Sequence, residues 1–125
     1  MVFEKKQCFG YCPVYKATFL NDGTVNVTYR QPGKDEKQAS FKLQAKEVCD
    51  LWERGEKLGF FSMKDRYETL RTDFPVREVT LFKKNKPKKV IYTEGGGADF
   101  DSYLTDLASL VESNLNVNFG PPEKE

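Results

Sequence analysis

The chain has 125 residues, 38% of them hydrophobic and 14% aromatic, so it is long enough and apolar enough to fold as one domain around one core. Its 20 Lys and Arg residues nearly balance its 19 Asp and Glu residues, and the net charge of +1 excludes a protein that is steered as a whole toward nucleic acid or an anionic membrane. The absence of His excludes catalytic sites that use Ser–His or Cys–His pairs and zinc sites that contain His.

A short mixed stretch over residues 2–7, which we interpret as an edge strand, leads into the segment CFGYCPVY at residues 8–15. Cys8 and Cys12 are four residues apart, a spacing compatible with a disulfide that closes a small loop. A redox pair more often has the spacing Cys-x-x-Cys at the start of a helix. Two thiols without His are too few for a closed zinc site, unless Cys49 and a carboxylate converge with them or a second chain contributes a ligand. A structural disulfide or a pair of buried free thiols is therefore the favoured interpretation, and we expect no metal and no cofactor.

Alternating apolar and polar residues predict an antiparallel meander between residues 15 and 43. The first two strands are joined by a turn at Asp22-Gly23, where the glycine can adopt a positive φ. A third strand passes through Ala39, Phe41 and Leu43. One face of this meander is apolar and the other is polar, which is typical of a sheet covered on one side.

Helical spacing replaces strand alternation over Ala45 to Leu58, and Gly59 follows at the position of a C-terminal cap. Gly55, within the apolar stripe, indicates a close approach of the helix to the sheet. Residues 64–75 read as a loop, a length that is uncommon in compact domains and often functional.

A second hairpin is predicted from strands at residues 76–83 and 90–93, with its turn at residues 84–87. Three glycines at residues 95–97 form a hinge, and apolar residues at helical spacing then predict a helix from about residue 99 to residue 114. The sequence thus predicts one α+β domain over residues 1–117, with an antiparallel β-sheet of about five or six strands and two α-helices packed on one face. We expect residues 118–125 to form a flexible tail, and we expect a monomer without a transmembrane segment.

Two clusters of charge are candidate contact sites. The carboxylates of Asp65, Glu68 and Asp73 lie on the predicted loop, where they could bind a hard cation, although their spacing matches no calcium loop and solvation of the loop is the simpler interpretation. The second cluster is basic and could contact phosphate or an acidic partner, or could be a solvated turn. It comprises Lys83, Lys84, Lys86, Lys88 and Lys89.

The pattern Cys-Phe-Gly-x-Cys-Pro-x-Tyr at residues 8–15, with Asp-Gly-Thr-Val at residues 22–25 and Leu-Gly-Phe-Phe-Ser-Met at residues 58–63, resembles a family of small bacterial domains of unknown function. The resemblance implies no activity, substrate or catalytic residue. Members of this family often follow secretion or lipoprotein signals, which implies a periplasmic or membrane-tethered location in the cell envelope, with the cytoplasm as the alternative. In that oxidising compartment a disulfide between Cys8 and Cys12 is favoured, leaving Cys49 as a buried thiol.

The sequence therefore predicts a non-enzymatic binding or interaction module of the bacterial cell envelope, which uses the cysteine segment and residues 64–75 as one end surface. Its partner would be another envelope protein or a small ligand, and nucleic acid is not expected. The alternatives are a thiol-redox or other enzyme that uses Cys8 and Cys12, and polyanion binding through Lys83 to Lys89. The candidate binding residues are Phe9, Tyr11, Tyr15, Asp65, Tyr67 and Asp73.

Overall fold

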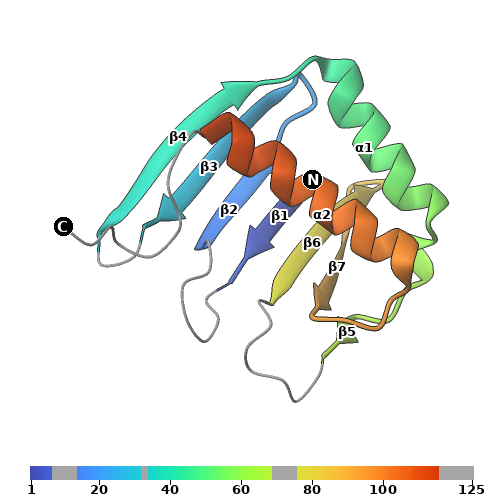
Figure 1. Cartoon of the computed structure of the whole chain (residues 1–125). Coiled ribbons are helices and arrows are strands. Elements are labelled where there is room, and N and C mark those ends of the chain that lie inside the picture. The colour runs from blue at the N-terminus through green and yellow to red at the C-terminus, as the bar shows by residue number, and fades with distance from the viewer. Residues whose placement is uncertain (7–13, 32–33, 69–75, 116–125) are drawn as a thin grey trace.

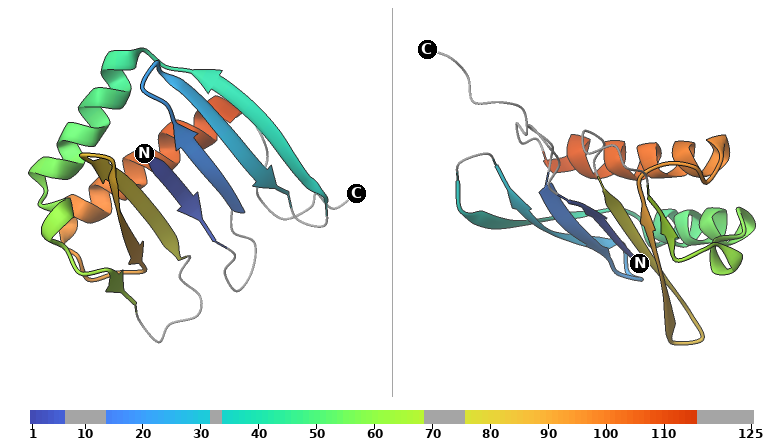
Figure 2. Two further views of the ribbon diagram at one scale, coloured as in Figure 1. Left: turned by 180° about the vertical axis from the view of Figure 1, so that it is seen from behind. Right: turned by 90° about the horizontal axis from the view of Figure 1, so that it is seen from below.

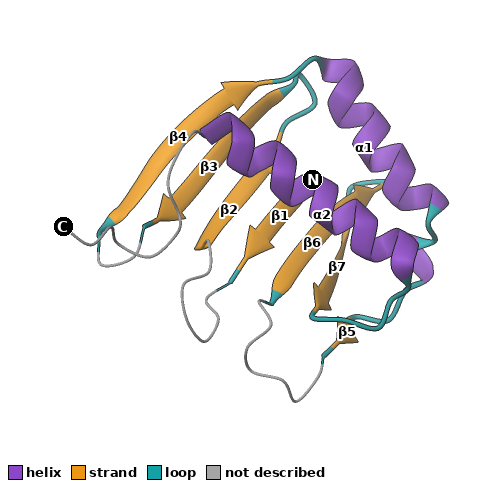
Figure 3. Ribbon diagram, in the orientation of Figure 1, coloured by secondary structure: helices purple, strands orange, loops and turns teal. Residues whose placement is uncertain are grey.

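The computed structural model describes residues 1–6, 14–31, 34–68 and 76–115, which form an α+β architecture of one mixed sheet and two α-helices (Figures 1 and 3). The strands are β1 (Val2–Lys5), β2 (Val14–Phe19), β3 (Thr24–Arg30), β4 (Glu36–Lys42), β5 (Arg66–Tyr67), β6 (Arg77–Lys83) and β7 (Lys86–Tyr92). The helices are α1 (Ala45–Lys57), the short 3-10 helix η1 (Phe60–Ser62) and α2 (Ala98–Leu115).

β1 lies at the centre of the sheet, so its interpretation as an edge strand is wrong. The strand order within the described residues is β4-β3-β2-β1-β6-β7-β5. β1 is antiparallel to both of its neighbours. Phe3 on β1 pairs with Ala17 on β2 and with Val79 on β6, and all three side chains are fully buried. The four residues of β1 are too few, and too mixed in polarity, to predict that this strand is central. Its position depends on pairing with two other strands, which the residues of β1 alone do not indicate.

The described sheet has seven strands rather than five or six, and it is not wholly antiparallel. β5 runs parallel to β7, with Tyr67 beside Tyr92, and it lies inside the segment that we predicted as a loop. Its backbone is held because Ile91 N donates to Asp65 O at 2.8 Å and Thr93 N donates to Tyr67 O at 2.6 Å. A strand of two residues is too short for alternation to reveal it.

The turns of the β2–β3 and β6–β7 hairpins can be compared with the predicted turns. Gly23 has a φ of 99°, and Thr24 N donates to the Asp22 carboxylate at 2.9 Å, so the predicted Asp-Gly turn is confirmed. The β6–β7 turn is shorter than predicted. Lys84 and Asn85 alone form it, both with positive φ (53° and 64°), because the following residues already belong to β7.

α2 crosses the apolar face of the sheet, and α1 lies along the ends of the strands beside it (Figure 2). Both predicted helices are confirmed. The Tyr103 hydroxyl of α2 donates to Leu51 O of α1 at 2.8 Å, which ties the helices together. A Cβ atom on Gly55 would lie 2.8 Å from Leu81 Cδ1, so this glycine does mark a close approach. Gly59, with a φ of 85°, follows the end of α1. No helix of the described residues is long and apolar enough to cross a membrane.

Candidate functional site

A groove of about 810 Å³ lies between α1 and the β6–β7 hairpin, and we call it the α1–hairpin groove. Figure 2 shows, in its left view, that α1, the hairpin tip and the N-terminus lie next to one another. This volume is typical of ligand-binding sites. α1 contributes Ala45, Lys46, Val48, Cys49 and Trp52, and the sheet and its turns contribute Met1, Asn21, Phe82, Lys84 and Asn85.

Two aromatic side chains, one from each wall, give the groove its apolar character. Trp52 Nε1 donates to Phe82 O at 2.9 Å, so the polar atom of the indole is already satisfied. The half-buried Trp52 ring packs against Phe61, with a centroid separation of 5.9 Å, and its remaining surface lines the groove. Phe82 is 46% exposed, because its neighbours Val79 and Leu81 are buried and alternation turns Phe82 away from the core. An exposed large aromatic ring inside a hollow is a typical contact surface for a partner.

Cys49 also lines the groove, and it is exposed, so the expectation of a buried thiol at this position is wrong. α1 buries Val48, and the next residue is turned about 100° around the helix axis, toward solvent. The Cys49 thiol donates weakly to the Glu53 carboxylate, with a sulfur–oxygen distance of 3.8 Å.

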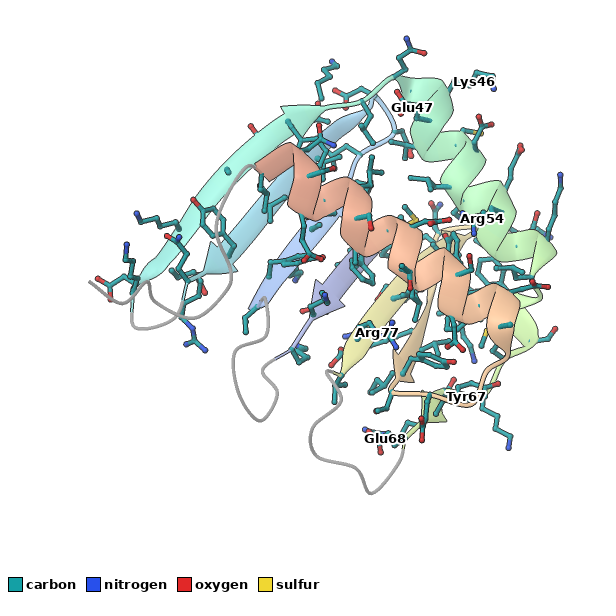
Figure 4. All side chains as sticks on the ribbon, in the orientation of Figure 1. Lys46, Glu47, Arg54, Tyr67, Glu68 and Arg77 are labelled. Carbon is teal, nitrogen blue, oxygen red and sulfur yellow. The ribbon has the colours of Figure 1, made fainter. Side chains whose placement is uncertain are left out.

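The rim of the groove is basic. Lys46 lies at one end of α1 and is paired with Asp50 at 2.9 Å (Figure 4). Lys84 lies opposite, and among the described residues no ion pair includes Lys84 or Lys86, although ion pairs engage their lysine neighbours. An incoming acidic group would therefore find unneutralised charge at the hairpin tip.

The other lysines of the predicted basic cluster are engaged within the fold. Lys83 Nζ lies 2.9 Å from a Glu56 carboxylate oxygen, and Lys88 Nζ lies 2.6 Å from Asp65. Lys89 Nζ lies 3.1 Å from Glu78. Three of the five lysines are thus engaged in ion pairs, whereas no ion pair of the described residues includes Lys84 or Lys86. Polyanion binding by the whole cluster stays a prediction.

Several predicted site residues lie outside the described residues: Cys8, Phe9, Tyr11, Cys12 and Asp73. The disulfide, the redox alternative and the aromatic surface around the cysteines accordingly stay predictions. The two strand ends that border these segments are adjacent, because Lys6 N donates to Val76 O at 2.8 Å.

Tyr15 is only 3% exposed, and its ring packs against Phe3 with a centroid separation of 6.0 Å. Its hydroxyl donates to the Glu112 carboxylate at 2.9 Å. Burial, and then the negative charge and hydrogen bond of Glu112, raise the pKa of Tyr15 well above its ordinary value. Tyr15 thus holds α2 to the sheet and offers little ring surface to a partner.

Asp65 and Tyr67 lie together at the opposite edge of the sheet, with three strands between them and Tyr15. A hydrogen bond from Lys88, and its positive charge, lower the pKa of the exposed Asp65 carboxyl. The Tyr67 ring lies 5.7 Å from the Tyr92 ring, and its hydroxyl accepts from Lys64 N at 3.1 Å. The structure therefore does not gather the described candidate residues into one site.

A protein-family model described as Domain of unknown function (DUF6438) matches residues 1–115. The chain belongs to this family. No curated protein and no solved structure matches it significantly. Membership of the DUF6438 family assigns no ligand and no reaction, so the function must be argued from the chemistry of the sites.

Sequence reasoning missed the aromatic pair of this DUF6438 domain as a site. Trp52 fits the apolar stripe of α1, which suggests a core position, and 30 residues separate it from Phe82. One signal was present in the sequence. In the alternation of β6, Phe82 falls on the face opposite Val79 and Leu81, where a polar side chain is usual.

Proposed function

We propose that this domain is a non-enzymatic binding module whose α1–hairpin groove docks a short protein segment with an apolar side chain beside acidic ones. The observation that carries the proposal is that the exposed Phe82 and the half-buried Trp52 both line this groove, beside Lys84, which no ion pair of the described residues includes.

The apolar part of the partner would bury its side chain between the two aromatic walls. Transfer of a Leu or Phe side chain from water to such a site is worth about 1.5–3 kcal/mol. Trp and other aromatic anchors in well-packed pockets commonly dominate binding energies. Because Trp52 is already fixed by its hydrogen bond to Phe82 O, little side-chain entropy is lost when the segment docks.

The polar part of the groove favours a peptide over a purely apolar ligand. The amide side chains of Asn21 and Asn85 can donate to and accept from a peptide backbone. Lys84 meets an acidic side chain, and its φ of 53° is costly for a residue with a long side chain.

We further propose that the domain acts in the bacterial cell envelope, in the periplasm or tethered to a membrane, where its partner is another envelope protein. The support is the resemblance of the cysteine segment to domains that follow secretion or lipoprotein signals.

The chain has a single Trp, so the fluorescence of Trp52 reports on the groove directly. The probe is the capped peptide Asp-Glu-Leu-Phe-Glu-Asp, titrated at low salt, and we expect a saturable shift of the emission. Phe82→Ala should weaken binding at least about tenfold, the loss of one apolar anchor. Lys84→Glu should also weaken binding of the peptide, and this loss of affinity should grow as the salt concentration is lowered. The matched control Lys34→Glu, in an exposed turn, should not weaken binding.

Three results would contradict the proposal. The first is no saturable response to the acidic peptide, and the second is equal binding of a peptide in which Lys replaces each acidic residue. The third is binding of decanoate without binding of the peptide, which would assign the groove to a small amphiphile instead.

A further inference from the structure

A second hollow, of about 450 Å³, lies under the C-terminal half of α2, and we call it the α2 hollow. Lys5 and Arg77 line it from the sheet, and α2 contributes Thr105, Ser109 and Glu112 among others. Arg77 stands at the start of β6, whereas the α1–hairpin groove begins near the end of that strand (Figure 4). The two sites are therefore separate.

Two cations face each other across adjacent strands in this hollow. Lys5 on β1 is the direct partner of Arg77 on β6. Like charges in that arrangement are destabilising unless an anion lies between them. Glu112 supplies one carboxylate, 3.3 Å from Lys5 Nζ, but the same oxygen also accepts the Tyr15 hydroxyl at 2.9 Å. One carboxylate thus serves two donors, and no ion pair of the described residues includes Arg77.

The Arg77 guanidinium is half-buried and incompletely partnered. Its Nη2 donates to Thr93 O at 3.1 Å, and its Cζ lies 5.3 Å from the centre of the Tyr92 ring. Its Nε is buried without a hydrogen-bond partner among the described residues. Asp101 attracts the guanidinium at longer range, but its carboxylate accepts the Tyr92 hydroxyl. A partly desolvated cation without a counter-ion is costly, so this arrangement favours an anion from outside.

The wall of α2 supplies the donors that such an anion needs. Thr105, Ser109 and Ser113 recur at a spacing of four residues, which places their hydroxyls in one row on the hollow. All three residues are exposed, so a ligand can reach them. Arginine with hydroxyl groups is a typical donor set for phosphate and carboxylate.

We infer that the α2 hollow binds one oxyanion, a phosphate or a carboxylate group, between Arg77, Lys5 and the hydroxyls of Thr105 and Ser109. The two cations and the single carboxylate of Glu112 leave one positive charge for the ligand. The hollow is larger than a phosphate ion and can also hold a small organic group that carries the oxyanion. The inference rests on a different site from the groove and stands independently of it.

The test measures the melting temperature of the full chain against inorganic phosphate, with chloride at equal ionic strength as the reference. We expect a saturable rise with phosphate, because a ligand that binds the folded state stabilises it. A second arm with acetate ranks the carboxylate against the phosphate. Arg77→Gln should weaken the apparent affinity at least about tenfold, since hydrogen bonds to charged groups are the stronger kind. The control Arg66→Gln, on the edge strand β5 and outside the α2 hollow, should leave it unchanged.

A second variant keeps the test valid if Arg77→Gln does not fold. Ser109→Asp places a carboxylate in the hollow from an exposed position, so the fold is retained. We expect its melting temperature to rise without phosphate and its response to phosphate to disappear. Ser102→Asp, elsewhere on α2, should keep the response, and so should Phe82→Ala in the groove. An unchanged response of Ser109→Asp to phosphate, or no saturable response of the unaltered chain to either anion, overturns the inference.

Discussion

At the scale of single residues, the surrounding structure changes the pKa of several tyrosines and imposes unusual backbone angles on the β6–β7 turn. Burial raises the pKa of three tyrosines, Tyr15, Tyr92 and Tyr103, above the ordinary value of about 10. A raised pKa in the folded state means that the fold favours the protonated phenol. The associated stability is therefore fully present below about pH 10 and is lost as the pH rises toward the folded-state pKa.

We expect the domain to unfold at alkaline pH, and Tyr15→Phe to move this loss of stability to higher pH because one buried phenol no longer ionises. At neutral pH the same variant should lose roughly 1.5–3 kcal/mol, the worth of a hydrogen bond to the Glu112 carboxylate. Circular dichroism and phenolate absorbance against pH measure both effects. If Tyr15→Phe had the same alkaline midpoint as the unaltered chain, Tyr15 would not contribute to it.

A second prediction at this scale concerns the backbone of the β6–β7 turn. A left-handed conformation costs an L-residue roughly 1–2 kcal/mol, and Lys84 adopts it. We expect Lys84→Gly to stabilise the fold in urea by about 0.5–1 kcal/mol while it weakens binding of the acidic peptide. Lys86→Gly, in the extended β7, should destabilise it instead. A stabilising Lys86→Gly would show that the conformation of Lys84 is not the cause.

At the scale of elements, the packing of α1 on its neighbours requires a glycine at position 55, because a larger side chain would not fit there. A Cβ on Gly55 would lie 2.8 Å from Leu81 Cδ1 and 2.9 Å from the Tyr103 hydroxyl oxygen. The same contact brings α1 close enough to α2 for Tyr103 to bond Leu51 O. The position of α1, and with it one wall of the groove, follows from this contact.

We therefore expect Gly55→Ala to destabilise the domain. The gain in helix propensity, about 1 kcal/mol, favours alanine. The steric overlap with the Leu81 methyl group and the Tyr103 ring opposes it and typically costs 1–3 kcal/mol. We predict a net loss of about 1 kcal/mol in urea unfolding, whereas the exposed Lys57→Ala should be nearly neutral. Stabilisation by Gly55→Ala would mean that α1 can move away from the sheet without cost.

At the scale of the whole molecule, β1 joins the two halves of the sheet. On one side it pairs with β2 and the meander, and on the other with β6 and the second hairpin. Phe3 lies at the centre of these pairings and is fully buried. The sheet should therefore unfold as one cooperative unit.

Phe3→Ala should cost about 3–5 kcal/mol and lower the stability of both halves together. Native-state hydrogen exchange checks this, since amides of β3 and of β7 should lose protection by the same amount. Leu20→Ala, at a side chain that is 39% exposed, is the control and should cost little. Loss of protection confined to β1 and β2 would show that the halves are stable separately.

The strongest sequence predictions concerned features that neighbouring residues decide. The turn at Gly23, the end of α1 before Gly59 and the extents of both helices depend on backbone angles and on apolar spacing within one segment. The close approach at Gly55 could also be predicted, because a glycine in an apolar stripe usually has a packing reason. These are short-range properties, so a single sequence contains them.

Only the tertiary structure decided which distant residues meet. The central place of β1, the parallel pairing of β5, the contact of Trp52 with Phe82 and the opposition of Lys5 and Arg77 all join segments far apart in the chain. Such pairs depend on how the strands are ordered, and no local pattern encodes that order. The sequence by itself determined an α+β domain with two amphipathic helices, whereas its candidate binding sites exist only because the fold brings these residues together.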